Sequence, residues 1–351
     1  MNDVLQLARP EIRTLEPYRH AAWAPAMVRL HANENPWADE TDGGVVDLNH
    51  YPEPQPRSLV VALSSLYGVA PDQLLIGRGS DEGIDLLVRA FCCAGRDRVI
   101  VCPPTFGMYG VAAAIQGAGV AAVPLDAEFG LDADAVLDAW SPGVKIVFLC
   151  SPNNPTGNSV DPRALERIAS GLDGRALVVL DEAYVEFSRS PSLVNRLQQW
   201  PGLVILRTLS KAHGLAGARC GAVLAAAPII SLLARMIPPY ALPAPTIAAA
   251  LGALGAPRLA RARDRIDRLI GERERMRGAL ARLPTVRRIW PSDANFLLVE
   301  FADAPVAHAA ALRAGLLLRD LSRLPRLEGC LRVTIGTPEQ NDRLIAGLEA
   351  A

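Results

Sequence analysis

The chain of 351 residues is long enough for one large and one small domain, because domains cluster near about 100–200 residues. Lys and Arg total 36 against 37 Asp and Glu, and this near-zero net charge argues against a nucleic-acid partner or an anionic membrane surface. The six cysteines lack the paired spacing of a metal site, so we expect no metal, free thiols and a cytoplasmic location. No apolar run reaches the roughly 20 residues of a membrane span, and we expect no secretory leader.

Two regions are predicted along the first part of the chain. Residues 1–40 are rich in proline and aromatic side chains and have little periodicity, which predicts an extended N-terminal arm that lies across another surface. Residues 41–245 alternate apolar runs with helix-like stretches and loops, which predicts a large α/β domain with a mostly parallel sheet buried on both faces. The expected strands are Leu74–Gly77, Val99–Pro103, Ala121–Leu125, Lys145–Cys150, Ala176–Leu180, Leu203–Arg207 and Cys220–Ala225.

The pattern changes after the proline-rich stretch 238–245, and residues 246–351 are predicted to form a smaller α+β domain. A run rich in Arg and Glu from Arg258 to Leu283 predicts a long helix that Pro284 ends. The alanine-rich stretch Ala302–Ala314 also has helical spacing. The expected strands of this domain are Val286–Trp290, Asn295–Phe301, Leu316–Arg319 and Leu331–Ile335.

Lysine is rare in this chain, which contains only Lys145 and Lys211. Lys211 follows an apolar strand, at the carboxyl end where open α/β sheets bind ligands, whereas Lys145 starts its strand. Only an amine can bond covalently to the aldehyde carbon of pyridoxal phosphate, and arginine cannot replace it. We therefore predict that Lys211 carries this cofactor as the central catalytic residue.

Three polar side chains follow other strands of the predicted sheet. Asp181 comes at the end of a hydrophobic strand, where its carboxylate would keep the pyridinium nitrogen of the cofactor protonated. Tyr184, three residues later, and Asn154, after another strand, could each donate a hydrogen bond to the phenolic oxygen of the ring. Each residue alone could belong to an ordinary turn, but together they predict a cofactor site in which Asp181 and Tyr184 join Lys211 in catalysis.

A phosphate site is predicted where a glycine-rich turn leads into a helix. The turn ends at Ser80 and Asp81, and the free N–H groups and dipole of a helix N-terminus favour an anion. Ser210 and Arg219 flank the lysine at spacings that let a hydroxyl and a guanidinium reach the same phosphate. Phe106 is preferred over its neighbour Tyr109 as the ring that stacks on the cofactor, with core packing as the alternative.

Five segments, in this order and spacing, resemble fold-type I aminotransferases, which depend on pyridoxal phosphate: GRGSDEGIDLLVRAF, CPPTFGMY, CSPNNPTG, DEAYVEF and LRTLSKAHGLAGARCG. The resemblance runs from the arm to the last helix. It implies a mostly parallel seven-stranded sheet in the large domain and a homodimer with its active site at the subunit interface. The roles it implies for Lys211, Asp181, Tyr184, Asn154 and Arg219 agree with those argued above.

Further segments resemble the histidinol-phosphate branch of these enzymes, at residues 15–18, 31–36, 51–56, 318–320 and 329–336. This resemblance implies that Arg319 and Arg332 hold the substrate's phosphate or the carboxylates of glutamate, with Tyr18 assisting from the other subunit. Tyr51 would reach across the interface to the cofactor phosphate. The implied substrates are histidinol phosphate with 2-oxoglutarate, and imidazole-acetol phosphate with glutamate.

Two departures from this branch leave the substrate preference open. Phe106 stands where tyrosine is frequent, and His213 with Gly214 replaces a more usual apolar pair. Paired arginines also suit other phosphorylated or dicarboxylate substrates, so an aromatic-amino-acid aminotransferase or a phosphothreonine decarboxylase on the same fold is the alternative. The cofactor-sensing half of a transcription regulator is disfavoured, because the arm before residue 40 is too short for a helix-turn-helix domain.

Overall fold

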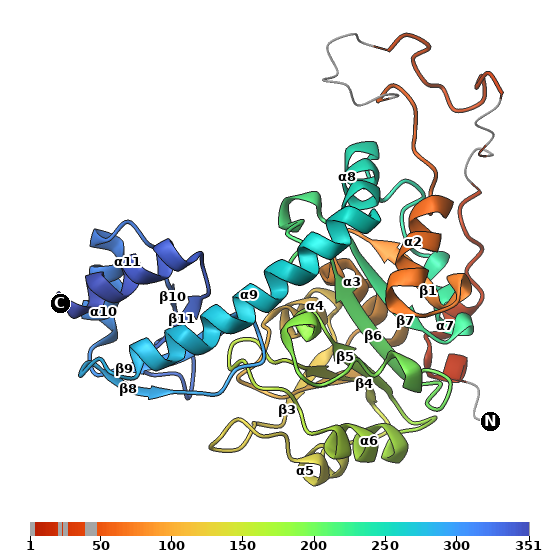
Figure 1. Cartoon of the computed structure of the whole chain (residues 1–351). Helices are drawn as coiled ribbons and strands as arrows, with labels where there is room; N and C mark the ends of the chain where they lie inside the picture. Colours follow the sequence, from red (N-terminus) through yellow and green to blue (C-terminus); the bar gives the residue numbers. More distant parts are fainter. Residues whose placement is uncertain (1–3, 20–22, 24–26, 39–47, 351) are drawn as a thin grey trace.

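The computed structural model describes residues 4–19, 23, 27–38 and 48–350. A seven-stranded sheet forms the larger body, and the long helix α9 (Ala256–Leu280) leads from it to a four-stranded sheet near the C-terminus (Figure 1). No helix in the described part of the chain is both long and apolar enough to cross a membrane. The predicted α/β class with a second, smaller α+β unit is confirmed.

The large sheet is parallel except for β7, which runs antiparallel to both of its neighbours. In spatial order its strands are β1 (Leu74–Gly77), β7 (Gly221–Ala225), β6 (Leu203–Thr208), β5 (Leu177–Asp181), β4 (Val144–Cys150), β2 (Arg98–Val101) and β3 (Gly119–Ala122). Parallel strands end at the same edge of a sheet, so the segments that follow β4, β5 and β6 emerge side by side. This edge brings the predicted cofactor residues together.

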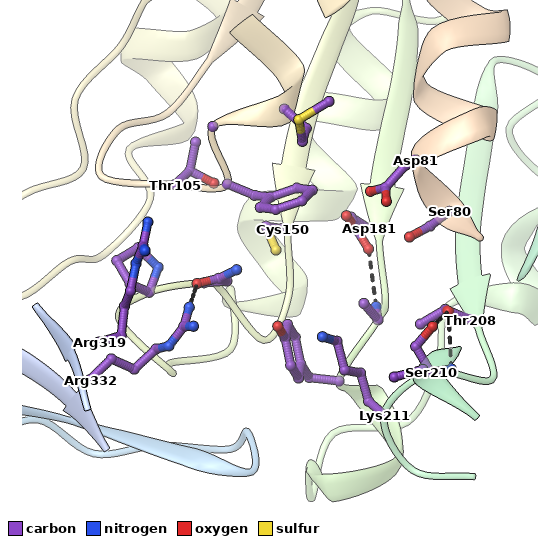
Figure 2. A pocket seen from close by; sticks show the side chains of 18 of the residues that line it. Ser80, Asp81, Thr105, Cys150, Asp181, Thr208, Ser210, Lys211, Arg319 and Arg332 are labelled. Atoms are coloured by element: carbon purple, nitrogen blue, oxygen red, sulfur yellow. Dashed lines mark hydrogen bonds between the residues drawn. The ribbon is translucent and has the colours of Figure 1, made fainter. Parts of the chain in front are cut away.

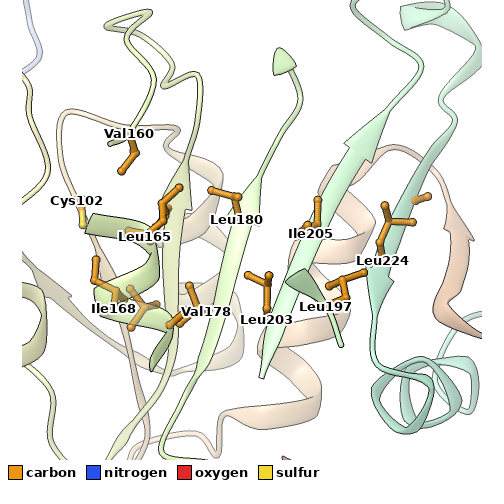
Figure 3. Close-up of a cluster of buried hydrophobic side chains, with 14 of the residues drawn as sticks. Cys102, Val160, Leu165, Ile168, Val178, Leu180, Leu197, Leu203, Ile205 and Leu224 are labelled. Carbon is orange, nitrogen blue, oxygen red and sulfur yellow. The ribbon is translucent and has the colours of Figure 1, made fainter. Parts of the chain in front are cut away.

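Helices cover both faces of the large sheet, which explains why its strands are apolar along their whole length. In β5, Val178 and Leu180 face one buried cluster, whereas Leu177 and Val179 face the other. The first cluster, drawn in Figure 3, includes side chains of α2 (Arg57–Tyr67), α5 (Ala133–Asp138), α6 (Pro162–Gly171) and α8 (Ala244–Leu254). The second includes side chains of α3 (Ser80–Phe91), α4 (Met108–Gln116) and α7 (Ala227–Ala234).

The small sheet is antiparallel and has its own buried core. Its order is β10 (Arg319–Asp320), β11 (Cys330–Thr334), β9 (Phe296–Phe301) and β8 (Val286–Ile289). Two helices, α10 (Ala304–Arg313) and α11 (Pro338–Glu349), pack on it together with the last part of α9. The register of β10 and β11 places Arg319 opposite Arg332, so two predicted substrate residues stand next to each other on adjacent strands.

The N-terminal segment differs from the predicted extended arm. Residues Val4–Leu7 and Pro10–Arg13 form short helices, and Val4 and Ala8 are buried in the second core cluster. The backbone N–H of Arg9 donates to Ala90 O of α3 at 2.9 Å. Val4 and Ala8 are four residues apart and so share one side of a helical turn, a spacing that is too short to recognise in a single sequence.

Two edge strands also differ from their predictions. β3 covers Gly119–Ala122 instead of Ala121–Leu125, and β10 contains only Arg319–Asp320 instead of Leu316–Arg319. The backbone N–H of Leu316 donates to Ala311 O at 2.8 Å and so completes the end of α10 rather than joining the sheet. The proposed arm boundary at residue 40 lies outside the described residues, and the division at residues 245 and 246, inside α8, stays a prediction.

Candidate active site

A cavity of about 600 Å³ opens where the carboxyl ends of β4, β5 and β6 face the small sheet (Figure 2). The predicted site residues that line it are Ser80, Asp81, Phe106, Asn154, Asp181, Tyr184, Ser210, Lys211, Arg219, Arg319 and Arg332. Tyr18 and Tyr51 do not line it. One chain therefore brings together all but two of the residues that were predicted to act at the site.

Asp181, the last residue of β5, is the buried acid of the cavity, with 2% of its surface exposed. Its Oδ2 accepts a hydrogen bond of 2.8 Å from Tyr109 Oη, and its Oδ1 accepts one of 3.1 Å from the backbone N–H of Ala183. Burial raises the pKa of Asp181 to about 6, although both hydrogen bonds favour the charged form. A carboxylate held in this way would gain much from a cationic partner in the cavity.

Lys211 follows β6 and points into the cavity (Figure 2). Its Nζ lies 5.6 Å from the centre of the Tyr184 ring, which packs edge-on against Phe296 with the ring centres 5.3 Å apart. Loss of hydration lowers the pKa of the Lys211 amine, and the Arg332 guanidinium lowers it further. At neutral pH the uncharged, nucleophilic form of the amine is therefore more populated in Lys211 than in an ordinary exposed lysine.

The small sheet contributes a cationic wall formed by Arg319 and Arg332. Arg332 Nη1 donates to Asn154 Oδ1 at 2.5 Å, which joins β11 to the loop after β4. Its Nε is buried without a hydrogen-bond partner among the described residues. Burial lowers the pKa of Arg332, and neighbouring Arg319 adds to this effect. An anion between the two arginines would satisfy the unpaired N–H and reduce their mutual repulsion.

An anion cradle lies on the opposite side of the cavity, at the N-terminus of α3. No side chain caps this helix, so the N–H groups of its first turn are open to a ligand. Ser210 Oγ lies within hydrogen-bond distance of Thr208 Oγ1 (2.9 Å) and Arg219 Nη1 (3.4 Å). Arg219 Nη2 donates to Asp81 Oδ2 at 3.2 Å. Three kinds of phosphate donor thus converge: helix N–H groups, a hydroxyl and a guanidinium.

A glycine allows β7 to pass directly behind this cradle. A Cβ atom added to Gly221 would stand 2.6 Å from Gly79 C, 2.7 Å from Ser80 N and 2.8 Å from Arg207 O. Gly79 itself has a φ of 86°, and its own added Cβ would meet Arg219 Nη2 at 2.8 Å. The turn before α3 can therefore approach an anion closely only because both positions lack a side chain.

The two tyrosines outside the cavity lie on other surfaces of the same chain. Tyr51 stacks on Tyr240 with the ring centres 4.4 Å apart, beside a separate cavity lined by the arm and α8. Tyr18 has 74% of its surface exposed. Their predicted roles require a second subunit and stay predictions.

Sequence reasoning missed the roles of three further residues in and behind the cavity. Tyr109 was considered only as a possible stacking ring, yet its hydroxyl holds Asp181. Leu321 and Leu324 of the small unit line the cavity beside the arginines. The partnership of Tyr109 and Asp181 joins residues 72 positions apart, so no local pattern could reveal it. The leucines follow β10, but nothing in their spacing distinguishes them from core residues.

The chemistry of these side chains fits pyridoxal phosphate. The cradle supplies donors for a phosphate, and Asp181 supplies a buried carboxylate for a ring nitrogen. Tyr184 and Asn154 supply polar groups to the cavity that also holds the amine of Lys211. Phe106 supplies an aromatic face. A phosphorylated pyridine with an aldehyde would meet a suitable partner at each of its functional groups.

Comparisons with known proteins agree with this fit. The family model described as aminotransferase class I and II matches residues 31–348, and this family depends on pyridoxal phosphate. A histidinol-phosphate aminotransferase of Stenotrophomonas maltophilia is 49% identical, over 100% of this chain and 98% of the relative. A crystal structure of histidinol-phosphate aminotransferase from Sinorhizobium meliloti in complex with pyridoxal-5'-phosphate has a TM-score of 0.78 at 26% identity, covering 87% of this chain and 83% of that one.

One similar structure carries a different activity. The crystal structure of L-threonine-O-3-phosphate decarboxylase from Porphyromonas gingivalis has a TM-score of 0.74 at 25% identity, covering 86% of this chain and 90% of that one. A shared fold therefore does not identify the reaction that a chain catalyses. The 49% identity over the whole length, by contrast, identifies the family within the fold. The chain belongs to the class I and II aminotransferases and, among them, to the family of the histidinol-phosphate aminotransferases.

Proposed function

We propose that this aminotransferase interconverts histidinol phosphate and 2-oxoglutarate with imidazole-acetol phosphate and glutamate, a step of histidine biosynthesis. The observation that carries the proposal is the pair Arg319 and Arg332, which face the cavity from adjacent strands. Two neighbouring guanidinium groups suit a dianionic phosphate or a carboxylate, and both kinds of anion occur in the proposed substrates. The name of the 49% identical relative supports the same substrate.

The residues of the cavity would divide the binding of pyridoxal phosphate among them. Ser80, Ser210 and Arg219 would hold its phosphate, with Asp81 keeping Arg219 in place through their ion pair. Asp181 would pair with the ring nitrogen, and Tyr184 and Asn154 would donate to the phenolic oxygen. Phe106 would stack on the ring. When bound, the cofactor supplies a ring that accepts the negative charge left by breaking the Cα–H bond of an amino donor.

Lys211 is the proposed base of the reaction. It would first hold the cofactor by a covalent bond to Nζ and, once an amino donor has displaced it, take the proton from the donor's Cα at that same atom. Its lowered pKa favours the uncharged amine that this proton transfer requires. Asp181 would stay ionised opposite the ring nitrogen and stabilise charge that develops only in the transition state.

The proposal includes a homodimer in the cytoplasm. Part of the arm exposes large apolar side chains, with Val28 at 88% and Leu30 at 89% exposure, which a second subunit would cover. In such a dimer Tyr51 would reach the partner's cofactor phosphate and Tyr18 the partner's substrate. The six cysteines are all free, as is usual for proteins kept in a reducing compartment.

A panel of substrates tests the proposed function. With glutamate as donor, kcat/KM for imidazole-acetol phosphate should exceed that for phenylpyruvate by roughly fivefold or more. The carboxylate of phenylpyruvate can also bind Arg332, but only a phosphate should engage Arg319 as well, an exposed ion pair of up to about 1 kcal/mol. A preference for phenylpyruvate would replace the proposal with an aromatic aminotransferase. Release of carbon dioxide from threonine phosphate, without amino transfer, would replace it with the decarboxylase activity of the Porphyromonas gingivalis neighbour.

A further inference from the structure

A buried tyrosine stands behind the carboxylate proposed to pair with the cofactor. Tyr109, the second residue of α4, is 0% exposed and donates through Oη to Asp181 Oδ2 at 2.8 Å. Phe106, Met108 and Val111 from the same stretch line the cavity, but Tyr109 does not. Tyr109 therefore touches neither the space for substrate nor the space for cofactor, and it acts on the site only through Asp181.

The ring of Tyr109 is held from two sides, so its hydroxyl has a fixed position. It stacks on Phe148 of β4 with the ring centres 4.7 Å apart and an interplanar angle of 3°. Phe106 packs edge-on against it at 5.6 Å and 85°. Burial raises the pKa of the Tyr109 hydroxyl well above its usual range, so this group keeps its proton and remains a donor at every working pH.

The charged state of Asp181 depends on the groups that surround it. Burial and Asp81 of α3 disfavour the carboxylate, whereas the Tyr109 hydroxyl, the Ala183 N–H and Lys211 favour it. Cys150 is the Cα partner of Asp181 in the β4–β5 ladder, and burial keeps its thiol neutral by raising its pKa. Among these groups Tyr109 is the only side chain with a hydrogen bond to Asp181 in the described structure.

We propose that Tyr109 is a positioning residue that keeps Asp181 ionised and aims its free lone pairs at the ring nitrogen of bound pyridoxal phosphate. This inference rests on the proposed function of Asp181. The site needs both a carboxylate and a fixed orientation of that carboxylate. The carboxylate comes from Asp181 of β5, whereas its orientation comes from Tyr109 of α4, 72 residues earlier in the chain. A rotated or protonated carboxyl group at this place could no longer hold the proton of a pyridinium.

The test measures how tightly full-length protein, dialysed free of cofactor, binds added pyridoxal phosphate between pH 5 and 8.5. Tyr109→Phe removes only the hydroxyl. Without this donor the carboxylate of Asp181 protonates at higher pH, so the acid limb of binding should move up by about 0.5–1 pH unit and Kd at pH 6 should rise about 3–10-fold. At pH 8.5, where the carboxyl group is ionised in both proteins, the difference should shrink.

The matched control is Tyr67→Phe, the loss of a hydroxyl from another buried tyrosine. Tyr67 is 5% exposed, lies in the opposite core cluster, and its hydroxyl has no hydrogen-bond partner among the described residues. The pH profile of cofactor binding in Tyr67→Phe should follow wild type, because this hydroxyl makes no hydrogen bond to Asp181. The ionisation of the added cofactor is the same for every variant, so it cannot cause a difference between them.

A kinetic measurement on Tyr109→Phe adds a second readout. Its kcat for glutamate should fall about 3–10-fold while KM stays within twofold of wild type.

Three outcomes decide the proposal. Overlapping pH profiles for Tyr109→Phe and wild type would overturn it while leaving the role of Asp181 intact. Normal turnover and an unshifted profile in Asp181→Asn would instead remove the proposed function on which it rests. If Tyr109→Phe does not fold, 3,5-difluorotyrosine at position 109 keeps the shape and donates more strongly, so the acid limb should move down, and an unmoved limb would overturn the proposal.

Discussion

Replacing Arg332 with alanine should damage both half-reactions, because this guanidinium is proposed to receive glutamate as well as the phosphorylated substrate. One of its N–H groups bonds Asn154, and its buried Nε has no partner among the described residues, which leaves donors for an anion. Two charge-assisted hydrogen bonds at about 1.5–3 kcal/mol each predict a loss of about 10²–10⁴-fold in kcat/KM. Arg332→Lys should recover only part of this, because lysine lacks the planar fork.

Arg319 should have a smaller and more selective effect. Its side chain is exposed, so a screened ion pair of up to about 1 kcal/mol predicts a loss of roughly fivefold in Arg319→Ala, confined to the phosphorylated substrate. The assay is single-turnover kinetics of each half-reaction, with glutamate, histidinol phosphate and phenylalanine as donors. The matched control is Arg323→Ala, because Arg323 is an exposed arginine four residues after Arg319 that does not line the cavity.

Two results would refute this reasoning. If Arg332→Ala kept both half-reactions within a few fold of wild type, the anion would bind elsewhere in the cavity. If Arg319→Ala left histidinol phosphate untouched while phenylalanine remained the better donor, the aromatic aminotransferase would be the correct function.

Three further predictions concern the lysine, the buried acid and a glycine. Lys211→Ala should abolish amino transfer and covalent fixation of the cofactor by borohydride, and labelling of Lys145 instead would contradict the site. Asp181→Asn should cut turnover by about 10²–10³-fold, the cost of losing a preorganised electrostatic partner of about 3–4 kcal/mol. Burial raises the pKa of Asp181 from 3.8 to about 6, so the cofactor-free fold loses stability as pH rises from about 4 to about 6, where the unfolded chain is ionised and the folded chain is not. Asp181→Asn should therefore melt higher than wild type at pH 7.5 but not at pH 4. Gly221→Ala should lower Tm through clashes with backbone that cost about 1–3 kcal/mol, while Gly278→Ala, in open space on α9, should raise it; equal Tm changes would refute the packing argument.

Local features of the sequence were sufficient for the main elements of the large body. Helix α3 follows the glycine-rich turn as expected, and β1 matches its prediction at both ends. The apolar runs were readable because strands buried on both faces need apolar side chains along their whole length. Lys211 and Asp181 could be selected because a strand-end position and a reactive side chain are properties of a few consecutive residues.

The tertiary structure decided what depends on residues far apart in the chain. The hydrogen bonds from Tyr109 to Asp181 and from Arg332 to Asn154 join residues 72 and 178 positions apart. Strands β3 and β10 were misplaced because their residues are mostly exposed and give little apolar pattern, unlike the fully buried edge strand β1. The sequence by itself thus determined which chemical groups the cavity holds, whereas folding determined their orientation and charge, because both depend on neighbours that only long-range packing supplies.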